Sequence, residues 1–163
     1  MNQPLPETPQ PFYSGKVRDL YPADEDRMII VASDRISAFD VVFPDPMPGK
    51  GEALNSISVE WFRFLRKCGL MEELGFSDHL IASDLKDFPE PYNRDEYFRG
   101  RSMYVKKTQR IDYECVVRGY IVGSGWKDYQ NSGAVCGHQL PQGLRLADKL
   151  EKPLFTPDRK SVV

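Results

Sequence analysis

The sequence predicts an α+β protein with hairpin-like strands in its first part and few helices. Short β-branched runs such as "RMIIVAS" alternate with glycine- and proline-rich turns, one long amphipathic segment follows them, and apolar strand-like runs return after residue 100. The elements do not alternate regularly between strand and helix, so a doubly wound parallel sheet is not expected.

The first strands surround a glycine-centred turn and a polar break. "YSGKVRDLY" places Gly15 between two segments of strand character. "RMIIVAS" (residues 27–33) is the next expected strand, "SDRIS" interrupts it, and "AFDVVF" resumes the apolar character. "PDPMPGKG" is expected to be a loop because of its proline and glycine content.

A helix is predicted over residues 52–68. Its apolar residues recur at three- and four-residue steps: Leu54, Ile57, Trp61, Leu65 and Cys68, with Phe62 beside them. This spacing places them on one face, and we expect that face to pack against the core. Arg66 and Lys67 suit the last helical turn, and Gly69 suits the residue that ends it.

Two further strands are expected in "YFRGRSMYVKKTQ" and "YECVVRGYIVGSGW". The second is unusually apolar, which is typical of a central strand. "WKDYQNSG" is predicted to add one or two helical turns before Gly133, and residues 137–157 are predicted to be mostly loop.

The composition argues against several classes of function. The net charge is −2 without a basic stripe, so neither nucleic acid nor a membrane surface is a predicted partner. No apolar run approaches the roughly 18 residues that span a bilayer, and the first residues lack the features of a signal peptide. We therefore expect a cytoplasmic protein, and the sequence makes no prediction of its oligomeric state.

Cysteine and histidine usage gives no metal site. Cys68, Cys115 and Cys136 are odd in number and form no C-x-x-C pattern, so we expect reduced, buried thiols. His79 and His138 have no partner at metal-ligand spacing, so no metal site is predicted in these residues.

"SGKVRD" (residues 14–19) is the first candidate site. Gly15 allows backbone N–H groups to approach an anion, and Lys16 and Arg18 add positive charge, which suits a polyphosphate. The stretch matches neither a Walker A loop nor G-x-G-x-x-G. The alternative is a plain hairpin turn with charged residues at the surface.

"SDRISAFD" (residues 33–40) is the second candidate site. It places Ser33, Asp34, Arg35 and Ser37 at the end of an apolar strand, a common location for ligand contacts. The alternative is a turn in which these side chains bond to their own backbone.

"ECVVRGYIVGSGW" (residues 114–126) is the third candidate site. Glu114 and Arg118 are four residues apart on an expected strand and so share a face. Ser124 stands between Gly123 and Gly125, and an arginine with a glycine-flanked serine predicts a phosphate clamp. The alternative is a structural glutamate–arginine pair at a sheet edge.

Five stretches in this order resemble the SAICAR synthetases, which are phosphoribosylaminoimidazole-succinocarboxamide synthases: "SGKVRDLY", "ASDRISAFDVVF", "PGKGEALNSIS", "ECVVRGYIVGSGWKDY" and "PLFTP". The resemblance covers nearly all of residues 12–157. It implies an ATP- and Mg²⁺-dependent ligase that joins L-aspartate to carboxyaminoimidazole ribonucleotide through an acyl phosphate in purine biosynthesis.

The resemblance also implies roles for individual residues. The residues matched to ATP binding are Gly15, Lys16, Val17, Arg18, Lys106 and Glu114. Those matched to substrate binding are Ser33, Asp34, Arg35, Ser37, Arg118 and Ser124, with Arg118 and Ser124 directed to the 5′-phosphate of the ribotide. The resemblance identifies no catalytic residue here.

The resemblance divides the chain into an extended proline-rich arm (residues 1–11), an antiparallel β-rich lobe (12–110) and the beginning of an ATP- and substrate-binding α+β lobe (111–157). The family continues further, and its Mg²⁺ ligands are expected in that later part. We therefore expect this chain to be inactive alone. The alternatives are a naturally short, catalytically dead nucleotide- or ribotide-binding module, and a phosphotransferase, whose H-R-D and D-F-G signatures are absent.

The last six residues, "DRKSVV" (158–163), depart from the family's "FTPSTK" pattern. They match the translation of GATCGGAAGAGCGTCGTGTAG, a stretch of a common sequencing adapter, up to its stop codon. We expect these residues to be non-native read-through, and different codons in the underlying nucleotides would contradict this expectation.

Overall fold

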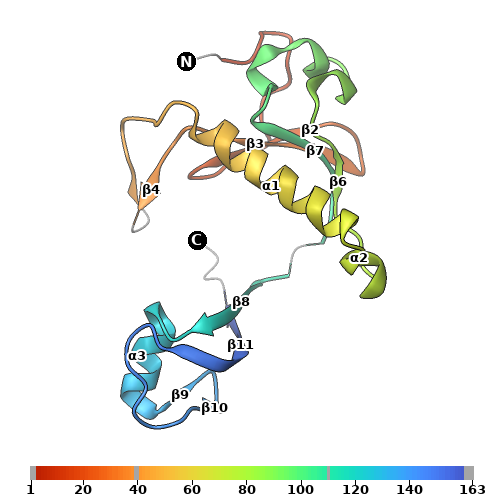
Figure 1. Ribbon diagram of the computed structural model, residues 1–163. Coiled ribbons are helices and arrows are strands. Elements are labelled where there is room, and N and C mark those ends of the chain that lie inside the picture. The colour runs from red at the N-terminus through yellow and green to blue at the C-terminus, as the bar shows by residue number, and fades with distance from the viewer. Residues whose placement is uncertain (1–2, 39–40, 110, 160–163) are drawn as a thin grey trace. The chain divides into compact units, whose positions relative to one another are not determined.

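A computed structural model describes residues 3–38, 41–109 and 111–159. The chain divides into two compact units, residues 1–108 and 109–163, and each is described by itself (Figure 1).

The first unit is built on a five-stranded antiparallel sheet. Its strands, in spatial order, are β1 (Tyr13–Ser14), β2 (Arg18–Pro22), β3 (Arg27–Ala32), β7 (Ser102–Lys106) and β6 (Leu80–Ala82). The predicted hairpin around Gly15 and the predicted strand from Arg27 are both confirmed. A separate hairpin of β4 (Ser37–Ala38) and β5 (Val41–Val42) follows, and residues 39–40 of the expected "AFDVVF" run lie outside the described residues.

Alternate residues of β3 divide the first unit into two cores, because successive strand residues face opposite sides of a sheet. Ile29 and Val31 join an aromatic cluster with the segment that contains η1 (Leu85–Asp87), η2 (Tyr92–Arg94) and η3 (Glu96–Phe98). Met28 and Ile30 pack on the other face, near Val59 of the helix α1 (Lys50–Lys67). The sheet therefore lies between α1 and the 3₁₀-helical segment.

The helix α1 begins two residues before its predicted start and ends at Lys67, with Gly69 in a left-handed conformation (φ 73°) as expected. The predicted core-facing stripe is wrong. Ile57 and Trp61 are 56% and 59% exposed, whereas Val59 on the opposite face is 5% exposed. A short helix, α2 (Leu70–Glu73), follows.

Close packing of α1 on the sheet explains this reversal. A Cβ atom at Gly51 would lie 2.1 Å from the carbonyl oxygen of Ala32, so only glycine fits there. The buried amide of Asn55 donates hydrogen bonds to the carbonyl oxygens of Gly100 and Ser102, at 2.9 and 3.3 Å. The helix therefore packs through Gly51, Asn55 and Val59. This interface leaves Leu54, Ile57, Trp61 and Phe64 exposed.

The amino-terminal segment contacts the rest of the first unit. The backbone N–H of Leu5 and the hydroxyl of Thr8 both donate to Asp95 Oδ2, at 2.7 and 2.8 Å. Thr8 is buried, and the turn from Leu5 to Thr8 therefore lies against the start of η3.

The second unit pairs β8 (Tyr113–Tyr120) with β11 (Lys149–Arg159) in an antiparallel sheet. Between them lie α3 (Gly123–Ser132), β9 (Ala134–Val135) and β10 (His138–Gln139), and the core consists of Ile121, Val135 and Leu150. The last residues of the segment predicted to be mostly loop instead form the long strand β11. Its Asp158 and Arg159 pair with Glu114 and Tyr113, while residues 160–163 of the expected non-native tail lie outside the described residues.

The expectation that the apolar strand is central is wrong for the described residues. β8 hydrogen-bonds to β11 as its one partner there, and Val117 is 65% exposed. The helix α3 is also longer than predicted, because its first turn includes Gly123, Ser124 and Gly125. Its start therefore lies directly after the turn that leaves β8.

The cysteines are free but exposed, so the prediction of burial is wrong. Cys68 ends α1 on its exposed side, and Cys136 occupies a turn with φ 46°, so neither position packs into a core. Within residues 3–38, 41–109 and 111–159, no group of three or more His, Cys, Asp or Glu side chains is placed to hold a metal ion. The same residues contain no helix with the length and apolar character needed to cross a membrane.

Candidate functional site

The loop of residues 15–18 connects β1 to β2 at one end of the first sheet. The N–H of Gly15 donates to the carbonyl oxygen of Arg18 at 2.8 Å, which closes the turn. A Cβ at Gly15 would lie 3.1 Å from the Tyr13 ring and 3.3 Å from that carbonyl oxygen. Glycine therefore allows the tight turn that the sequence predicts at this position.

The structure brings this loop together with the second candidate stretch. Arg35 donates to the carbonyl oxygens of Gly15 and Lys16 at 3.0 and 3.2 Å, and to both carboxylate oxygens of Asp19 at 2.8 and 3.0 Å. Ser33 donates from its hydroxyl and its backbone N–H to the carbonyl oxygen of Val17, at 2.9 and 3.0 Å. Residues 33–35 therefore hold the loop from one side.

The ion pair between Arg35 and Asp19 is partly buried. The side chain of Asp19 is only 6% exposed. The hydrogen bonds that Asp19 accepts from Arg35 raise the pKa of the guanidinium, whereas the partial burial of Arg35 acts to lower that pKa. The guanidinium therefore stays charged, and the pair is a fixed part of the loop's support.

Asp34 turns away from the loop and supports α1. Its Oδ1 accepts a hydrogen bond from the backbone N–H of Gly51 at 2.9 Å, where the start of a helix leaves N–H groups without partners. Its Oδ2 lies 3.4 Å from Arg101, which also donates to Glu52 at 3.1 Å and lies over the Tyr97 ring. Arg101 therefore lies between the two carboxylates and offsets one of their two negative charges.

A cleft of about 760 Å³ opens beside these side chains. Its lining includes three of the four substrate residues predicted in this stretch, Ser33, Asp34 and Arg35, together with Glu52, Tyr97 and Arg101. The fourth, Ser37, lies in the β4–β5 hairpin opposite Val42 and does not line this cleft. The cleft is wide enough for a small molecule.

Lys106 lies at the other end of the sheet from the Gly15–Arg18 loop. In the strand register Arg18 pairs with Ala32, whereas Lys106 pairs with Arg27, five positions further along β3. At ~3.3 Å per residue this separation is about 17 Å. The backbones of the two predicted ATP-binding elements therefore stand well apart within the first unit.

The second unit brings together Arg118 and Ser124, the predicted phosphate clamp. Arg118 Nη2 donates to the Ser124 hydroxyl at 2.8 Å, and its Nε donates to Thr156 Oγ1 at 3.0 Å. The buried Thr156 hydroxyl donates in turn to the carbonyl oxygen of Val116 at 3.1 Å. The side chain of Arg118 is thus fixed between two strands and the start of α3.

The start of α3 adds an electrostatic contribution to the clamp. The first N–H groups of a helix have no intrahelical partner and carry partial positive charge, so they attract anions. Here Ser124 and Gly125 lie in that first turn, and the charged end of Arg118 lies beside it. A cation, a hydroxyl and helical N–H groups at one place make a site suited to a phosphate ester.

Glu114 does not join this clamp. It is four residues from Arg118 on β8, about 13 Å along the strand, and it is exposed opposite Asp158. In the described part of the chain Arg118 bonds to Ser124, Thr156 and Val122 rather than to Glu114. The alternative of a structural Glu114–Arg118 pair is therefore wrong.

Sequence reasoning missed three residues that shape these sites: Asp19, Arg101 and Thr156. Asp19 and Thr156 stand inside the quoted stretches "SGKVRD" and "PLFTP", but nothing local indicated a role. Each acts through a partner distant in sequence: Asp19 through Arg35, Arg101 through Asp34, and Thr156 through Arg118. Only the tertiary fold brings such partners together.

Comparison with known proteins identifies the family of the chain. A family model described as SAICAR synthetase matches residues 11–163. The curated phosphoribosylaminoimidazole-succinocarboxamide synthase of Leptospira interrogans is 50% identical over 151 residues, which make up 93% of this chain and 50% of that protein. The synthase of Desulfosudis oleivorans is 53% identical over 150 residues, or 90% of this chain and 48% of that protein. The chain thus spans about half the length of the curated relatives it matches.

Solved structures give the same result. The SAICAR synthase of Saccharomyces cerevisiae, solved with SAICAR, superposes with a TM-score of 0.79 at 35% identity, covering 98% of this chain and 53% of that one. A SAICAR synthetase solved with ADP superposes with a TM-score of 0.62 at 24% identity over 91% of this chain and 50% of that one, and this second likeness shows the fold. With five motifs in order, a mixed α and β fold with antiparallel sheets, and a family model that matches nearly the whole chain, this chain belongs to the SAICAR synthetase family.

Proposed function

We propose that this chain supplies the phosphate-binding elements for the ATP-dependent joining of L-aspartate to carboxyaminoimidazole ribonucleotide. The observation that supports this best is the convergence of Arg118, Ser124 and Thr156 at the start of α3. We assign this clamp to the 5′-phosphate of the ribotide. The relative from Saccharomyces cerevisiae, solved with the ribotide product SAICAR, lends support through its similarity over 98% of this chain.

We assign the ATP phosphates to the loop of residues 15–18. Glycine allows the backbone to approach an anion, and Lys16 and Arg18 add charge to it. Lys106 lies at the far end of the first sheet and Glu114 belongs to the second unit, so we keep both as candidates for other parts of the nucleotide.

The proposed reaction has two steps. A carboxylate oxygen of the ribotide attacks the γ-phosphorus of ATP, which forms an acyl phosphate and releases ADP. The amine of L-aspartate then attacks the acyl carbon, inorganic phosphate leaves, and the nitrogen loses a proton to give the amide. Positioning and charge stabilisation dominate catalysis of phosphoryl transfer, so fixing both phosphate groups is the contribution we assign to this chain.

Mg²⁺ does not fit a site in the described residues, since they contain no group of three or more acidic, histidine or cysteine side chains that could hold it. We therefore derive no step through the metal and propose that its ligands lie outside these residues. We also expect the 163-residue chain alone to form no product, because it spans about half the length of its relatives.

A chimaera tests the proposal. The matched 151 residues of the Leptospira interrogans relative are replaced by those of this chain, and SAICAR formation is measured with ATP, L-aspartate and carboxyaminoimidazole ribonucleotide. We expect product that depends on all three substrates. Arg118→Ala should raise the KM for the ribotide by about tenfold or more, since it removes a charged hydrogen-bond donor to the phosphate.

The matched control is Arg145→Ala, which removes a highly exposed arginine of the same unit that pairs with Asp148 among the residues described. This variant should leave the KM unchanged. A chimaera that melts cooperatively like its parent but forms no product would contradict the ligase assignment. If that inactive chimaera still bound the ribotide, the result would favour the alternative of a binding module.

A further inference from the structure

Three consecutive carbonyl groups of the loop at residues 15–18 face the segment of residues 33–35. Arg35 binds the carbonyl oxygens of Gly15 and Lys16, and Ser33 binds that of Val17 twice. Such a run of backbone acceptors bound from one side is unusual in a surface turn, where water ordinarily satisfies them. The segment therefore fixes the orientation of the peptide groups in the loop.

That orientation matters for an anion. Peptide groups are dipoles, and a loop that binds phosphate must turn its N–H ends toward the ligand and its carbonyl ends away. We infer that Arg35 is a positioning residue that holds the carbonyls of the loop away from a bound phosphate, and that Asp19 holds Arg35 in place. This inference rests on the proposed function, in which the loop binds the phosphates of ATP.

The chemistry of Arg35 suits positioning better than direct binding. A guanidinium has five N–H donors in a rigid plane. Four of them are used within the protein: one each for Gly15 and Lys16, and two for Asp19. One N–H remains for any ligand, so most of the hydrogen bonding of this side chain shapes the loop.

Asp19 connects the loop to the rigid sheet. It lies in β2 with Ser14 and Val31 as its strand neighbours, and its carboxylate is bound by Arg35 through two parallel hydrogen bonds. Paired bonds of this kind fix an angle as well as a distance. The Arg35–Asp19 pair therefore ties the loop to β2, which is itself held in the sheet by the strands on either side of it.

The test compares Arg35→Gln and Asp19→Asn with a matched control. Arg66 makes the same kind of contact elsewhere in the unit, with two bonds to Asp78 and one to the carbonyl oxygen of Leu80. Arg66→Gln therefore removes an equivalent arginine–aspartate pair without touching the loop. Arg35→Lys keeps the charge, loses the planar fork, and serves as a milder variant should Arg35→Gln fail to fold.

Two measurements on the full chain are combined. Limited trypsin digestion reports the rate of cleavage after Lys16 and Arg18 without any ligand, and an NMR titration gives the Kd for ATP. For Arg35→Gln and Asp19→Asn we expect cleavage after Lys16 to accelerate and the Kd to rise, each by about tenfold, the equivalent of one charged hydrogen bond. Arg35→Lys should give a cleavage rate and a Kd between those of the wild type and Arg35→Gln. Arg66→Gln should match the wild type in both measurements.

The outcomes separate this inference from the proposed function. Unchanged cleavage at the loop in Arg35→Gln would overturn the inference, and so would faster cleavage with an unchanged Kd. If instead Lys16→Ala and Arg18→Ala leave the Kd for ATP unchanged, or the wild type binds no ATP, the assignment of the loop to ATP fails. In that case the digestion still decides whether Arg35 fixes the loop, but its role toward phosphate falls with the assignment.

Discussion

The side chain of Arg118 lies directly over the backbone of Gly125. A Cβ built at position 125 would come within 3.1 Å of Arg118 Nε and 3.2 Å of its Cδ. The glycine therefore makes room for the arginine at the start of α3, where the arginine also reaches Ser124 and Thr156.

Gly125→Ala should displace Arg118 and weaken binding of the ribotide phosphate. We expect the Kd for a 5′-phosphoribotide to rise by about tenfold, because the arginine loses the geometry of its charged hydrogen bonds. Gly119→Ala is the matched control, since nothing lies within 4 Å of a Cβ there. Calorimetric titration of both variants measures the difference, and equal affinities would contradict the crowding argument.

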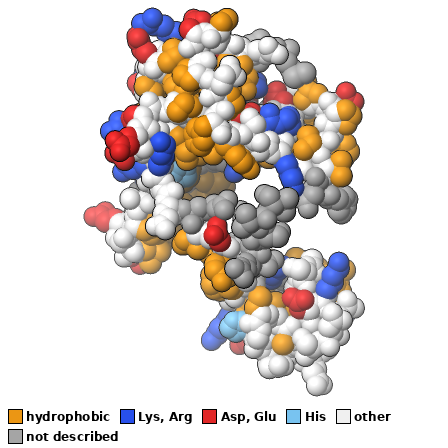
Figure 2. All heavy atoms as spheres, turned by 180° about the vertical axis from the view of Figure 1, so that it is seen from behind, with side chains coloured by type: hydrophobic (Ala, Val, Ile, Leu, Met, Phe, Trp, Pro, Cys, Tyr) orange, Lys and Arg blue, Asp and Glu red, His pale blue; other side chains and the backbone are white. Residues whose placement is uncertain are grey.

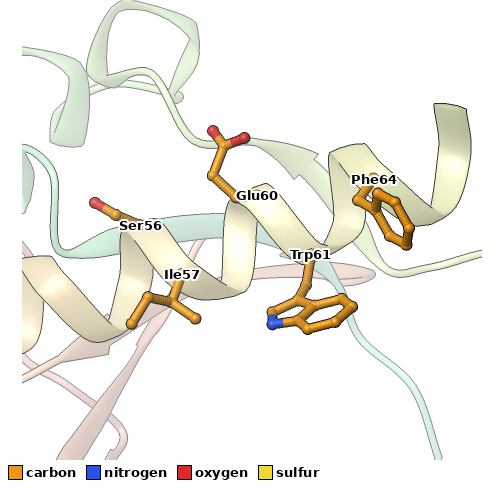
Figure 3. Close-up of a pocket in the computed structure, with 5 residues that line it drawn as sticks. All are labelled: Ser56, Ile57, Glu60, Trp61 and Phe64. Atoms are coloured by element: carbon orange, nitrogen blue, oxygen red, sulfur yellow. The ribbon is translucent and has the colours of Figure 1, made fainter.

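Ile57→Lys should leave the stability of the first unit nearly unchanged. Its side chain projects from the same side of α1 as Trp61, beside a shallow hollow of about 490 Å³ that also includes Phe64 (Figure 3). Val59→Ala should lower the free energy of unfolding by about 1–3 kcal/mol, because this side chain is buried against the sheet. Urea unfolding distinguishes the two; a large loss in Ile57→Lys would indicate that this face is covered after all.

The second unit should self-associate through its two-stranded sheet. Hydrophobic side chains reach the surface of both units (Figure 2), and in the second unit they include Val117 of β8 and Phe155 of β11. Exposed strands with apolar residues promote pairing between chains. Val117→Lys should therefore reduce association in sedimentation velocity, whereas Leu146→Lys, also exposed but outside the sheet, should not. A monodisperse wild-type chain would contradict this prediction.

The ion pair between Arg66 and Asp78 should make stability depend on pH. Hydrogen bonds from Arg66 lower the pKa of Asp78, and burial opposes this in part. A carboxyl whose pKa is lower in the folded state stabilises the protein above its unfolded pKa of about 3.9, and this stabilisation is lost as the pH falls through the folded value.

Asp78→Asn should therefore lower the free energy of unfolding by about 1–2 kcal/mol at pH 7. The difference from the wild type should be smaller at acidic pH, because protonation of Asp78 has by then weakened the same ion pair in the wild type. The comparison is made by urea unfolding at pH 7 and pH 3. Glu60→Gln is the control, since it removes the exposed pair with Arg63 and should have little effect at either pH. A constant difference between Asp78→Asn and wild type across this range would contradict the assignment.

The sequence predicted the local elements well where local chemistry dominates. The turn at Gly15, the strand from Arg27 and the end of α1 at Gly69 follow from the conformational preferences of the residues at those positions and of their immediate neighbours. The order of the motifs was sufficient to indicate the family. The predicted pairing of Arg118 with Ser124 was also within reach, because only six residues separate them.

Predictions of which face of a helix or strand packs against the rest of the protein were less successful. Periodicity identified the apolar face of α1, but periodicity cannot say that Gly51 and Asn55 would pack against the sheet instead. In the same way, the apolar character of β8 indicated a central strand, while the described residues give it one partner. Both errors arise because burial depends on the partner surface, which lies far away in sequence.

The sequence by itself indicated the family, the strands around Gly15 and from Arg27, and the helix α1, and it proposed the residues that could meet phosphate. The tertiary structure decided how those residues are supported. It placed Arg35 against the carbonyls of the loop at residues 15–18, fixed Arg35 with Asp19, and set Thr156 behind Arg118. The physical reason is that a hydrogen bond depends on distance and angle, and for residues 16 to 38 positions apart only the folded backbone sets them.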